Sequence, residues 1–197
     1  MAENAVRVAG PEEVTRVLRT LSVGMQEDPV LAWLFPDDAS RVSRIERLFG
    51  VAARLYPDAA EIYRNEDCTA GAFWISPGRF RVPIGRRLRM FPSVVRAVGG
   101  AAGLRMSNDL DKRHPKEPHH YYLLILAATQ GNRGRGIGSA LMQPVLERCD
   151  AEGVPAYLES ANPQNQPFYR RYGFEIREEM RLPGGCPPIW GMWREPP

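Results

Sequence analysis

Hydrophobic side chains recur every three or four positions along two stretches of the N-terminal third of the chain. The first stretch follows Gly10-Pro11-Glu12-Glu13, which is typical of a helix start, and the second runs from Val42 to Tyr56. This spacing gathers the apolar side chains on one helix face, so each stretch predicts an amphipathic helix. The apolar positions are Val14, Val17, Leu18 and Leu21 in the first and Ile45, Leu48, Phe49, Ala52 and Leu55 in the second.

Short apolar runs bounded by glycine, proline and polar residues predict strands. They cover residues 6–9, 61–64, 70–75, 121–128, 156–159, 174–177 and 189–193. Further helices are expected over residues 88–104, with Pro92 and Gly99-Gly100 as candidate breaks, over 137–149 and over 165–172, whereas 108–118 is expected to be a loop. This alternation predicts an α/β fold with a central mixed sheet flanked by helices.

Composition and charge indicate which classes of protein the chain can belong to. The 197 residues are enough for one domain spanning 1–197, and a charged fraction of 25% is ordinary for a globular protein. The net charge of +3 does not by itself favour a nucleic-acid partner, and three distant cysteines without a CxxC motif suggest neither a disulfide framework nor a metal site. Because no apolar run approaches about 18–20 residues and Met1–Pro11 has no signal-peptide core, we expect a cytoplasmic protein with no membrane partner.

The most informative segment is Tyr121–Met142. Its apolar strand leads into a loop that holds Gly131, Gly134, Gly136 and Gly138, and a helical pattern follows. A strand, a glycine-rich loop and a helix start together direct backbone N–H groups and the positive end of the helix dipole at one anion. Arg133 and Arg135 add positive charge among the glycines, so we expect a phosphate-bearing ligand here.

Several interpretations compete for this loop. A dinucleotide-binding unit needs glycines directly after the strand and an acid about 20 residues on. Glu159 lies near that distance, but the gap after Ala128 is too long and only some 60 residues remain for the rest of such a sheet. A Walker-type loop needs a lysine that is absent here, and a connector without any ligand stays open.

The segment Arg133–Gly138 fits the pattern Gln/Arg-x-x-Gly-x-Gly/Ala, the signature of the GNAT acetyltransferase superfamily. Residues 158–174, with the sequence LESANPQNQPFYRRYGF, closely resemble the N-x₆-Y-x₃-GF segment of the same family. The resemblance extends from about His114 to Arg194. Within the superfamily, HPKEPHHYYL before the strand and IWGMWREP near the end are most similar to the branch that contains puromycin N-acetyltransferase.

The resemblance implies a sheet in which two parallel strands, 122–128 and 156–160, are splayed to hold the pantetheine arm of acetyl-CoA. It places backbone groups of the first strand on the pantetheine amides and the glycine loop on the pyrophosphate. Phe168 would pack near the cofactor, and Asn162 and Asn165 would contact its arm, although a turn and a helix cap are equally open for these two. The cofactor-binding residues are Leu126, Ala127, Ala128, Arg133, Gly134, Arg135, Gly136, Ile137, Gly138, Ser139, Asn162, Asn165 and Phe168.

Tyr169 matches the tyrosine that protonates the departing thiolate in many relatives, with a packed aromatic as the alternative. The chain departs from the family pattern at Gln130-Gly131, where relatives often have proline, and it lacks the strand glutamate that serves some relatives as a base. His119 and His120 precede the strand, and only one of them can face the cleft. One of them, taken as His120, is a candidate base. Glu159 is another, acting through water, with a purely structural role as its alternative, and loss of a proton to solvent is a third option.

The acceptor pocket is expected to be built from the first helices and the residues before the central strand. Aromatic walls with a few polar groups suit a small organic amine. The aromatic candidates are Trp33, Phe35, Tyr56, Phe73, Trp74 and Tyr121, among which Trp33, Phe35, Trp74 and Tyr121 are taken as substrate-binding.

These features together predict an N-acetyltransferase that moves the acetyl group of acetyl-CoA to a small-molecule amine by direct attack. No metal and no nucleic acid are expected, and a homodimer is left open. Two alternatives stand beside this prediction, a protein or peptide acetyltransferase on the same fold and a non-catalytic acyl-CoA-binding domain.

Overall fold

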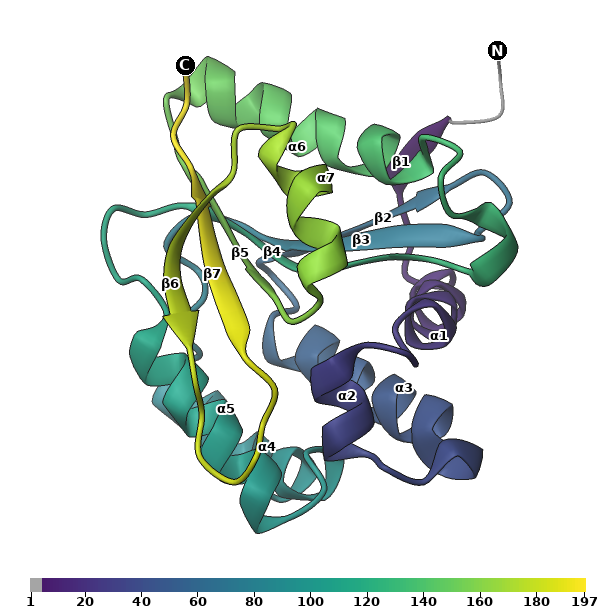
Figure 1. Cartoon of the computed structure of the whole chain (residues 1–197), viewed down its shortest axis with the longest axis vertical. Coiled ribbons are helices and arrows are strands. Elements are labelled where there is room, and N and C mark those ends of the chain that lie inside the picture. Colours follow the sequence, from purple (N-terminus) through teal and green to yellow (C-terminus); the bar gives the residue numbers. More distant parts are fainter. Residues whose placement is uncertain (1–4) are drawn as a thin grey trace.

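The computed structural model describes residues 5–197, and its centre is a seven-stranded sheet in the order β1-β2-β3-β4-β5-β7-β6 (Figure 1). Residues 1–4, part of the segment considered for a signal peptide, lie outside the described range. Neighbouring strands are antiparallel except β4 and β5, which are parallel, so the predicted mixed sheet is confirmed. The strands are β1 Val6–Val8, β2 Ala60–Asn65, β3 Ala70–Ile75, β4 Tyr121–Ala128, β5 Ala156–Ser160, β6 Glu175–Met180 and β7 Ile189–Arg194.

Helices cover both faces of this sheet. Side chains of α1 and α3 pack on one face in the first core cluster, and side chains of α6 pack on the other face in a second cluster. Within the described part of the chain, no helix is both long and apolar enough to cross a membrane. The helices are α1 Val14–Gly24, α2 Pro29–Leu34, α3 Asp38–Leu55, α4 Ile84–Ala97, α5 Ala101–Arg113, α6 Ile137–Glu152 and α7 Gln166–Arg170.

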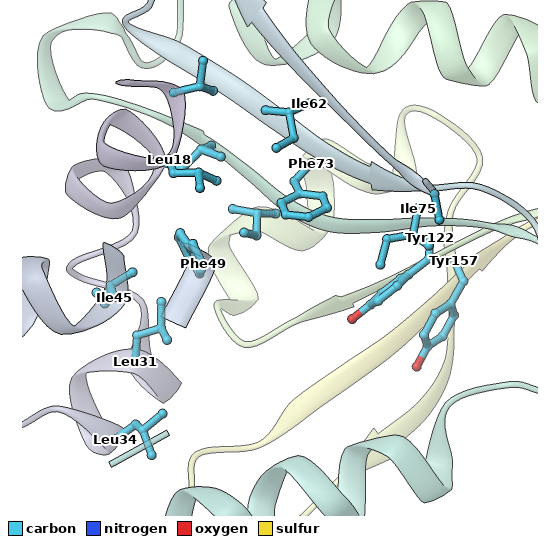
Figure 2. Close-up of a cluster of buried hydrophobic side chains, with 14 of the residues drawn as sticks. Leu18, Leu31, Leu34, Ile45, Phe49, Ile62, Phe73, Ile75, Tyr122 and Tyr157 are labelled. Carbon is cyan, nitrogen blue, oxygen red and sulfur yellow. The ribbon is translucent and has the colours of Figure 1, made fainter. Parts of the chain in front are cut away.

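The first core cluster explains why the N-terminal helices dock as they do. Leu18 of α1, with Ile45 and Phe49 of α3, meets Ile62 and Phe73 of the sheet (Figure 2). All of these side chains are buried, and the helical spacing seen in the sequence supplies the apolar face. The burial of a Leu, Ile or Phe side chain stabilises the fold by about 1.5–3 kcal/mol. This cluster therefore fixes α1 and α3 against the strands that lead to the cleft.

The region after β3 differs from the sequence prediction. The expected break at Gly99-Gly100 is confirmed, because both glycines have positive φ angles, 76° and 102°, that end α4 and start α5. Helix α4 nevertheless begins at Ile84, earlier than predicted, and contains Pro92. The prediction of a loop over 108–118 was wrong in its first half, because α5 continues to Arg113 with polar residues on its exposed side.

Candidate active site

A cleft opens where β4 and β5 separate. The two strands pair only between Tyr121–Leu123 and Ala156–Leu158, although β4 continues to Ala128 and β5 to Ser160. Beyond Leu123 each strand presents an edge to the space between them. The residues that line the cleft are Met25, Asp28, Leu123, Leu124, Ile125, Leu126, Leu158, Glu159, Ser160, Ala161, Asn165 and Tyr169.

Strand β4 has a bulge at the position where the cleft opens. Phe73 of β3 pairs with Ile125 and Trp74 pairs with Leu123, which leaves Leu124 as an extra residue. An extra residue interrupts the ladder of hydrogen bonds and turns backbone groups away from the neighbouring strand. Since Leu124 also lines the cleft, backbone groups here are available to a ligand. The apolar run of β4 has no glycine or proline that would have indicated this bulge from the sequence.

The glycine loop leads directly into the N-terminus of α6. Gly134 and Gly136 have φ angles of 77° and 79°, which glycine adopts without steric strain. Gly136 is the N-cap of α6, no side chain caps the helix, and the first backbone bond back into it runs from Ala140 N to Gly136 O at 3.1 Å. The N–H groups of Ile137, Gly138 and Ser139 thus stand at the positive end of a helix dipole, which is an anion-binding arrangement.

The side chain of Arg133 is bound to α1. Its guanidinium donates to the carbonyl of Gly24 at 2.9 Å and to Glu27 Oε2 at 3.3 Å. A cation at the carboxyl end of a helix is favoured by the helix dipole. Arg133 therefore anchors the glycine loop to the end of α1, a contact that the sequence did not indicate.

Helix α7 places three of the predicted residues around the same region. Tyr169 is buried and lines the cleft, and burial, with Asp28 as a second cause, raises the pKa of its hydroxyl above the ordinary value. Phe168 packs on the first turn of α6, where a Cβ on Gly138 would lie 3.4 Å from its ring. Asn165 lines the cleft and makes no side-chain cap, whereas the Asn162 side chain accepts from Gln164 N at 3.0 Å and so stabilises the turn before α7.

Glu159 stands on the other wall of the cleft, one residue beyond the last β4–β5 pair. Its carboxylate accepts hydrogen bonds from the hydroxyls of Tyr122 at 3.0 Å and Tyr157 at 3.2 Å. Figure 2 shows the two tyrosine rings side by side with their hydroxyl oxygens directed the same way. Burial is the largest cause that raises the pKa of both phenols, so they remain donors to the carboxylate. The side chain of Glu159 keeps 13% of its surface exposed, which leaves it open to a ligand.

The expectation that one of the two adjacent histidines faces the cleft was wrong, because neither is among the residues that line it. His119 is exposed, while the ring of His120 lies between the Pro118 carbonyl, 2.9 Å from Nδ1, and His114 Nε2, 3.1 Å from its own Nε2. Burial lowers the pKa of His120 to about 4. His120 is not among the residues that line the cleft, so the geometry favours Glu159 over His120 as a base.

His114 is a member of this group that sequence reasoning missed. Its side chain is 4% exposed, its Nδ1 lies 3.8 Å from Glu159 Oε1, and its ring stacks on Phe80 with centroids 3.6 Å apart. The sequence places His114 far from Glu159, and only the folded sheet brings them together. Within residues 5–197, no group of three or more His, Cys, Asp or Glu side chains is arranged to hold a metal ion.

Asp28 adds a second carboxylate to the cleft. Its Oδ1 accepts from Val30 N and Leu31 N at 3.0 and 3.1 Å, so it caps α2, and burial raises its pKa. A capping carboxylate explains why α2 starts where it does. The position of Asp28 beside the cleft gives this wall negative charge.

Three of the aromatic residues predicted for the acceptor pocket lie elsewhere. Phe35 is fully buried in the first core cluster, and Trp74 and Tyr121 are buried in the second cluster under α6, on the opposite face of the sheet. The prediction that they line a pocket was wrong because each is packed as core. Trp33 differs, since it is only partly buried and faces Gly184 and Gly185 in the β6–β7 connection.

Comparison with known sequences supports the family resemblance over part of the chain. A model of the acetyltransferase (GNAT) family matches residues 94–174, which contain β4, the glycine loop and α7. An uncharacterized N-acetyltransferase of Schizosaccharomyces pombe is 33% identical over 67 residues, which make up 34% of this chain and 27% of that protein. The match thus spans little more than a quarter of the curated relative.

Comparison with solved structures covers nearly the whole chain. A protein of Corynebacterium glutamicum described as histone acetyltransferase HPA2 and related acetyltransferase has a TM-score of 0.74 at 22% identity, over 98% of this chain and 96% of that one. Arylalkylamine N-acetyltransferase 2 from Aedes aegypti has a TM-score of 0.62 at 10% identity, over 97% and 98%. The fold is therefore that of GNAT acetyltransferases, and the family model supports the superfamily, whereas the puromycin-like branch stays a prediction.

Proposed function

We propose that this chain is an N-acetyltransferase of the GNAT superfamily that transfers the acetyl group of acetyl-CoA to the amine of a small molecule. The observation that carries the proposal is the separation of β4 from β5 next to the uncapped N-terminus of α6. An edge of free backbone groups suits the amides of a pantetheine arm, and a helix N-terminus suits a pyrophosphate.

The residues present fit such a cofactor. Backbone groups of Leu126, Ala127 and Ala128 would bind the pantetheine amides, and Asn165 lies in the same cleft. The loop from Arg133 to Ser139 would hold the pyrophosphate through its N–H groups, because the glycines bring no Cβ between backbone and ligand. Phe168 would support the first turn of α6 from the other side.

When bound, acetyl-CoA supplies a thioester carbonyl that an unprotonated amine can attack. Glu159 would take a proton from the acceptor ammonium, which frees the nitrogen lone pair. A backbone N–H of the bulged segment at Leu124 would stabilise the negative oxygen that forms as the C–N bond is made. Tyr169 would give its hydroxyl proton to the sulfur as the C–S bond breaks, and the second N–H proton of the former amine returns the phenol to its neutral state.

The charge of the cleft supports a cationic acceptor. Asp28 and Glu159 both line it, and an ammonium between two carboxylates is electrostatically favoured. A protein or peptide acceptor is the second candidate, favoured by the fold shared with a protein described as a histone acetyltransferase. The non-catalytic acyl-CoA-binding domain is the third. The cytoplasmic location and the single domain over 1–197 belong to the same proposal, and a homodimer is left open.

A thiol-release assay tests this function. Purified protein is incubated with acetyl-CoA and a panel of arylalkylamines, polyamines and lysine-containing peptides, and free thiol is measured against a protein-free control. The proposal expects turnover with at least one small amine that exceeds turnover with every peptide. Turnover with peptides alone would contradict the proposal and favour a protein or peptide acetyltransferase. Binding of acetyl-CoA without any turnover would favour a non-catalytic acyl-CoA-binding domain.

A further inference from the structure

The hydrogen bonds around His120 determine where the protons of two histidine rings lie. A carbonyl oxygen only accepts, so His120 Nδ1 donates to Pro118 O. His120 is neutral near pH 7 because burial lowers its pKa to about 4, and its Nε2 therefore carries a lone pair. That lone pair must accept from His114 Nε2, which lies 3.1 Å away.

These hydrogen bonds also determine which atom of His114 faces Glu159 without a proton. With a proton on Nε2, a neutral His114 has a lone pair on Nδ1, and Nδ1 faces Glu159 Oε1 at 3.8 Å. It is a buried nitrogen with no hydrogen-bond partner among the described residues. A lone pair that faces a carboxylate is unfavourable, whereas one proton between them converts the contact into an attraction.

We propose that His114 Nδ1 and Glu159 act together as one proton acceptor at the wall of the cleft, which holds no proton at rest, so that the proton that Glu159 takes from the acceptor ammonium passes on to His114 Nδ1. His114 does not line the cleft and acts through Glu159, so it is a positioning residue. Where it concerns the acceptor, this inference rests on the proposed function.

The proton transfers balance in two steps. The N–H bond of the ammonium breaks and an O–H bond forms on Glu159, which leaves a neutral amine and a carboxylic acid. The O–H bond then breaks as an N–H bond forms on His114 Nδ1, which restores the carboxylate and produces an imidazolium. When the product has left, the proton returns through Glu159 to solvent at the open cleft.

The titratable side chains that surround this pair stay neutral. Tyr122 and Tyr157 face it from β4 and β5, Tyr56 lies beyond Phe80, and burial raises the pKa of all three phenols, so they stay neutral. His120 stays neutral for the reason given above, with Arg177 and His119 among the further causes that lower its pKa. Glu178 of β6 acts on Tyr157. Among these groups, the proton from the acceptor therefore has His114 Nδ1 as its final acceptor.

Nitrogen NMR of the imidazole rings tests the inference without any acceptor. The chain has 3 histidines, so a long-range ¹H–¹⁵N spectrum contains few ring signals, and His119→Asn assigns the exposed one without touching the cleft. We expect His114 to carry its neutral-state proton on Nε2 and to gain the second on Nδ1. In Glu159→Gln, the protonation of His114 Nδ1 should occur at a pH lower by one unit or more, because the carboxylate that stabilises the imidazolium is gone.

Two NMR outcomes would overturn the proposal. One is a neutral His114 that carries its proton on Nδ1, and the other is an unchanged titration of His114 in folded Glu159→Gln. Amide spectra of each variant verify the fold.

A kinetic test follows once the amine panel has given an acceptor. In His114→Gln, the acidic limb of kcat/KM should shift to lower pH by about one unit, because a carboxylate, which is a weaker base than an imidazole, is then the final proton acceptor. The KM for acetyl-CoA should stay unchanged, and His119→Asn should match the wild type throughout. An unshifted limb in His114→Gln would contradict the inference. If no amine is turned over, the proposed function fails, while the NMR result still decides whether His114 Nδ1 and Glu159 act together.

Discussion

Tyr169 and Glu159 stand on opposite walls of one cleft in environments suited to opposite tasks. Burial and the neighbouring Asp28 raise the pKa of the Tyr169 hydroxyl, so the phenol stays protonated and able to donate. Glu159 accepts from two tyrosine hydroxyls and faces His114, which keeps its carboxylate in a fixed orientation. We therefore propose Tyr169 of α7 as the acid and Glu159 of β5 as the base.

Replacement of Tyr169 by Phe removes the acid and keeps the packed ring. We expect kcat to fall by about 10²-fold, which is the usual contribution of a positioned acid, with no change in the KM for acetyl-CoA. Steady-state kinetics with the best amine of the panel measures both. Tyr172→Phe, three positions along the chain and outside the cleft, is the matched control and should keep wild-type activity; equal kcat in the two variants would remove Tyr169 from the mechanism.

The sequence predicted those cleft residues that belong to a local motif, and it did not predict those that only the fold brings together. Tyr169 and Asn165 lie in the cleft, as the family segment implied. His114 has no local pattern, since its partners lie on β4 and β5. Trp74 and Tyr121 were misassigned because strand periodicity separates two faces of a sheet but does not say which face a helix covers.

At the scale of elements, the end of α1 lies against the end of β4. A Cβ on Gly24 would stand 2.8 Å from the carbonyl oxygen of Ala128 and 2.9 Å from Ala127 Cβ, both closer than atoms tolerate. Arg133 binds the Gly24 carbonyl from the glycine loop. One small residue thus lets the helix, the strand and the loop meet at the edge of the cleft.

Gly24→Ala should lower the free energy of unfolding by about 1–3 kcal/mol, as overpacking does in a close contact. Gly50→Ala in α3 is the matched control, because its Cβ would meet only the end of the Arg54 side chain at 4.0 Å. There the change should stabilise by about 0.5–1 kcal/mol, the difference between alanine and glycine inside a helix. Urea unfolding at neutral pH measures both, and equal destabilisation in the two variants would contradict the close approach at Gly24.

The type of an element could be predicted where the apolar pattern extended over many residues, as for α1, α3 and β4. The residues at which elements begin and end were harder to predict. The start of α4 was not predicted because arginines interrupt the apolar positions of its first turns. The bulge at Leu124 was not predicted because an uninterrupted apolar run is equally compatible with a regular strand. Such features depend on the neighbouring strand rather than on local propensity.

At the scale of the whole molecule, two groups make stability depend on pH in a defined direction. His120 has a folded pKa of about 4, lowered by burial from 6.5, so the unfolded chain binds its proton more readily. Stability should therefore fall as pH decreases from about 6.5 to about 4. Glu13, whose pKa is lowered to about 2 chiefly by hydrogen bonds from Arg64 and Arg7, stabilises the fold above about 4.5, and that contribution is lost as pH falls toward 2.

Urea unfolding of the wild type and His120→Gln at pH 7 and pH 5 tests the first of these effects. The wild type should lose about 1–2 kcal/mol between the two values, and the variant should lose clearly less because its amide does not titrate. His119→Asn, at the exposed neighbour, should behave like the wild type. An identical loss in wild type and His120→Gln would refute the assignment to the buried ring.

The order of strands and the parallel pair β4–β5 did not follow from periodicity alone, since a run of strands fits many orders. Only the parallel pair became predictable, through the resemblance in residues 133–138 and 158–174, which implied two splayed parallel strands. The structure has this pair, with the glycine loop at the open end. The proposed function requires that this open end binds acetyl-CoA.

Calorimetric titration with acetyl-CoA tests that claim most directly. The wild type and Gly131→Ala should bind with micromolar affinity, because Gly131 has no positive φ and open space around its Cβ position. The double variant Gly136→Val, Gly138→Val should remain folded by circular dichroism and lose binding, since side chains would then cover the N-terminus of α6. Absence of binding by the wild type, or equal binding by the valine variant, would contradict the proposed cofactor site.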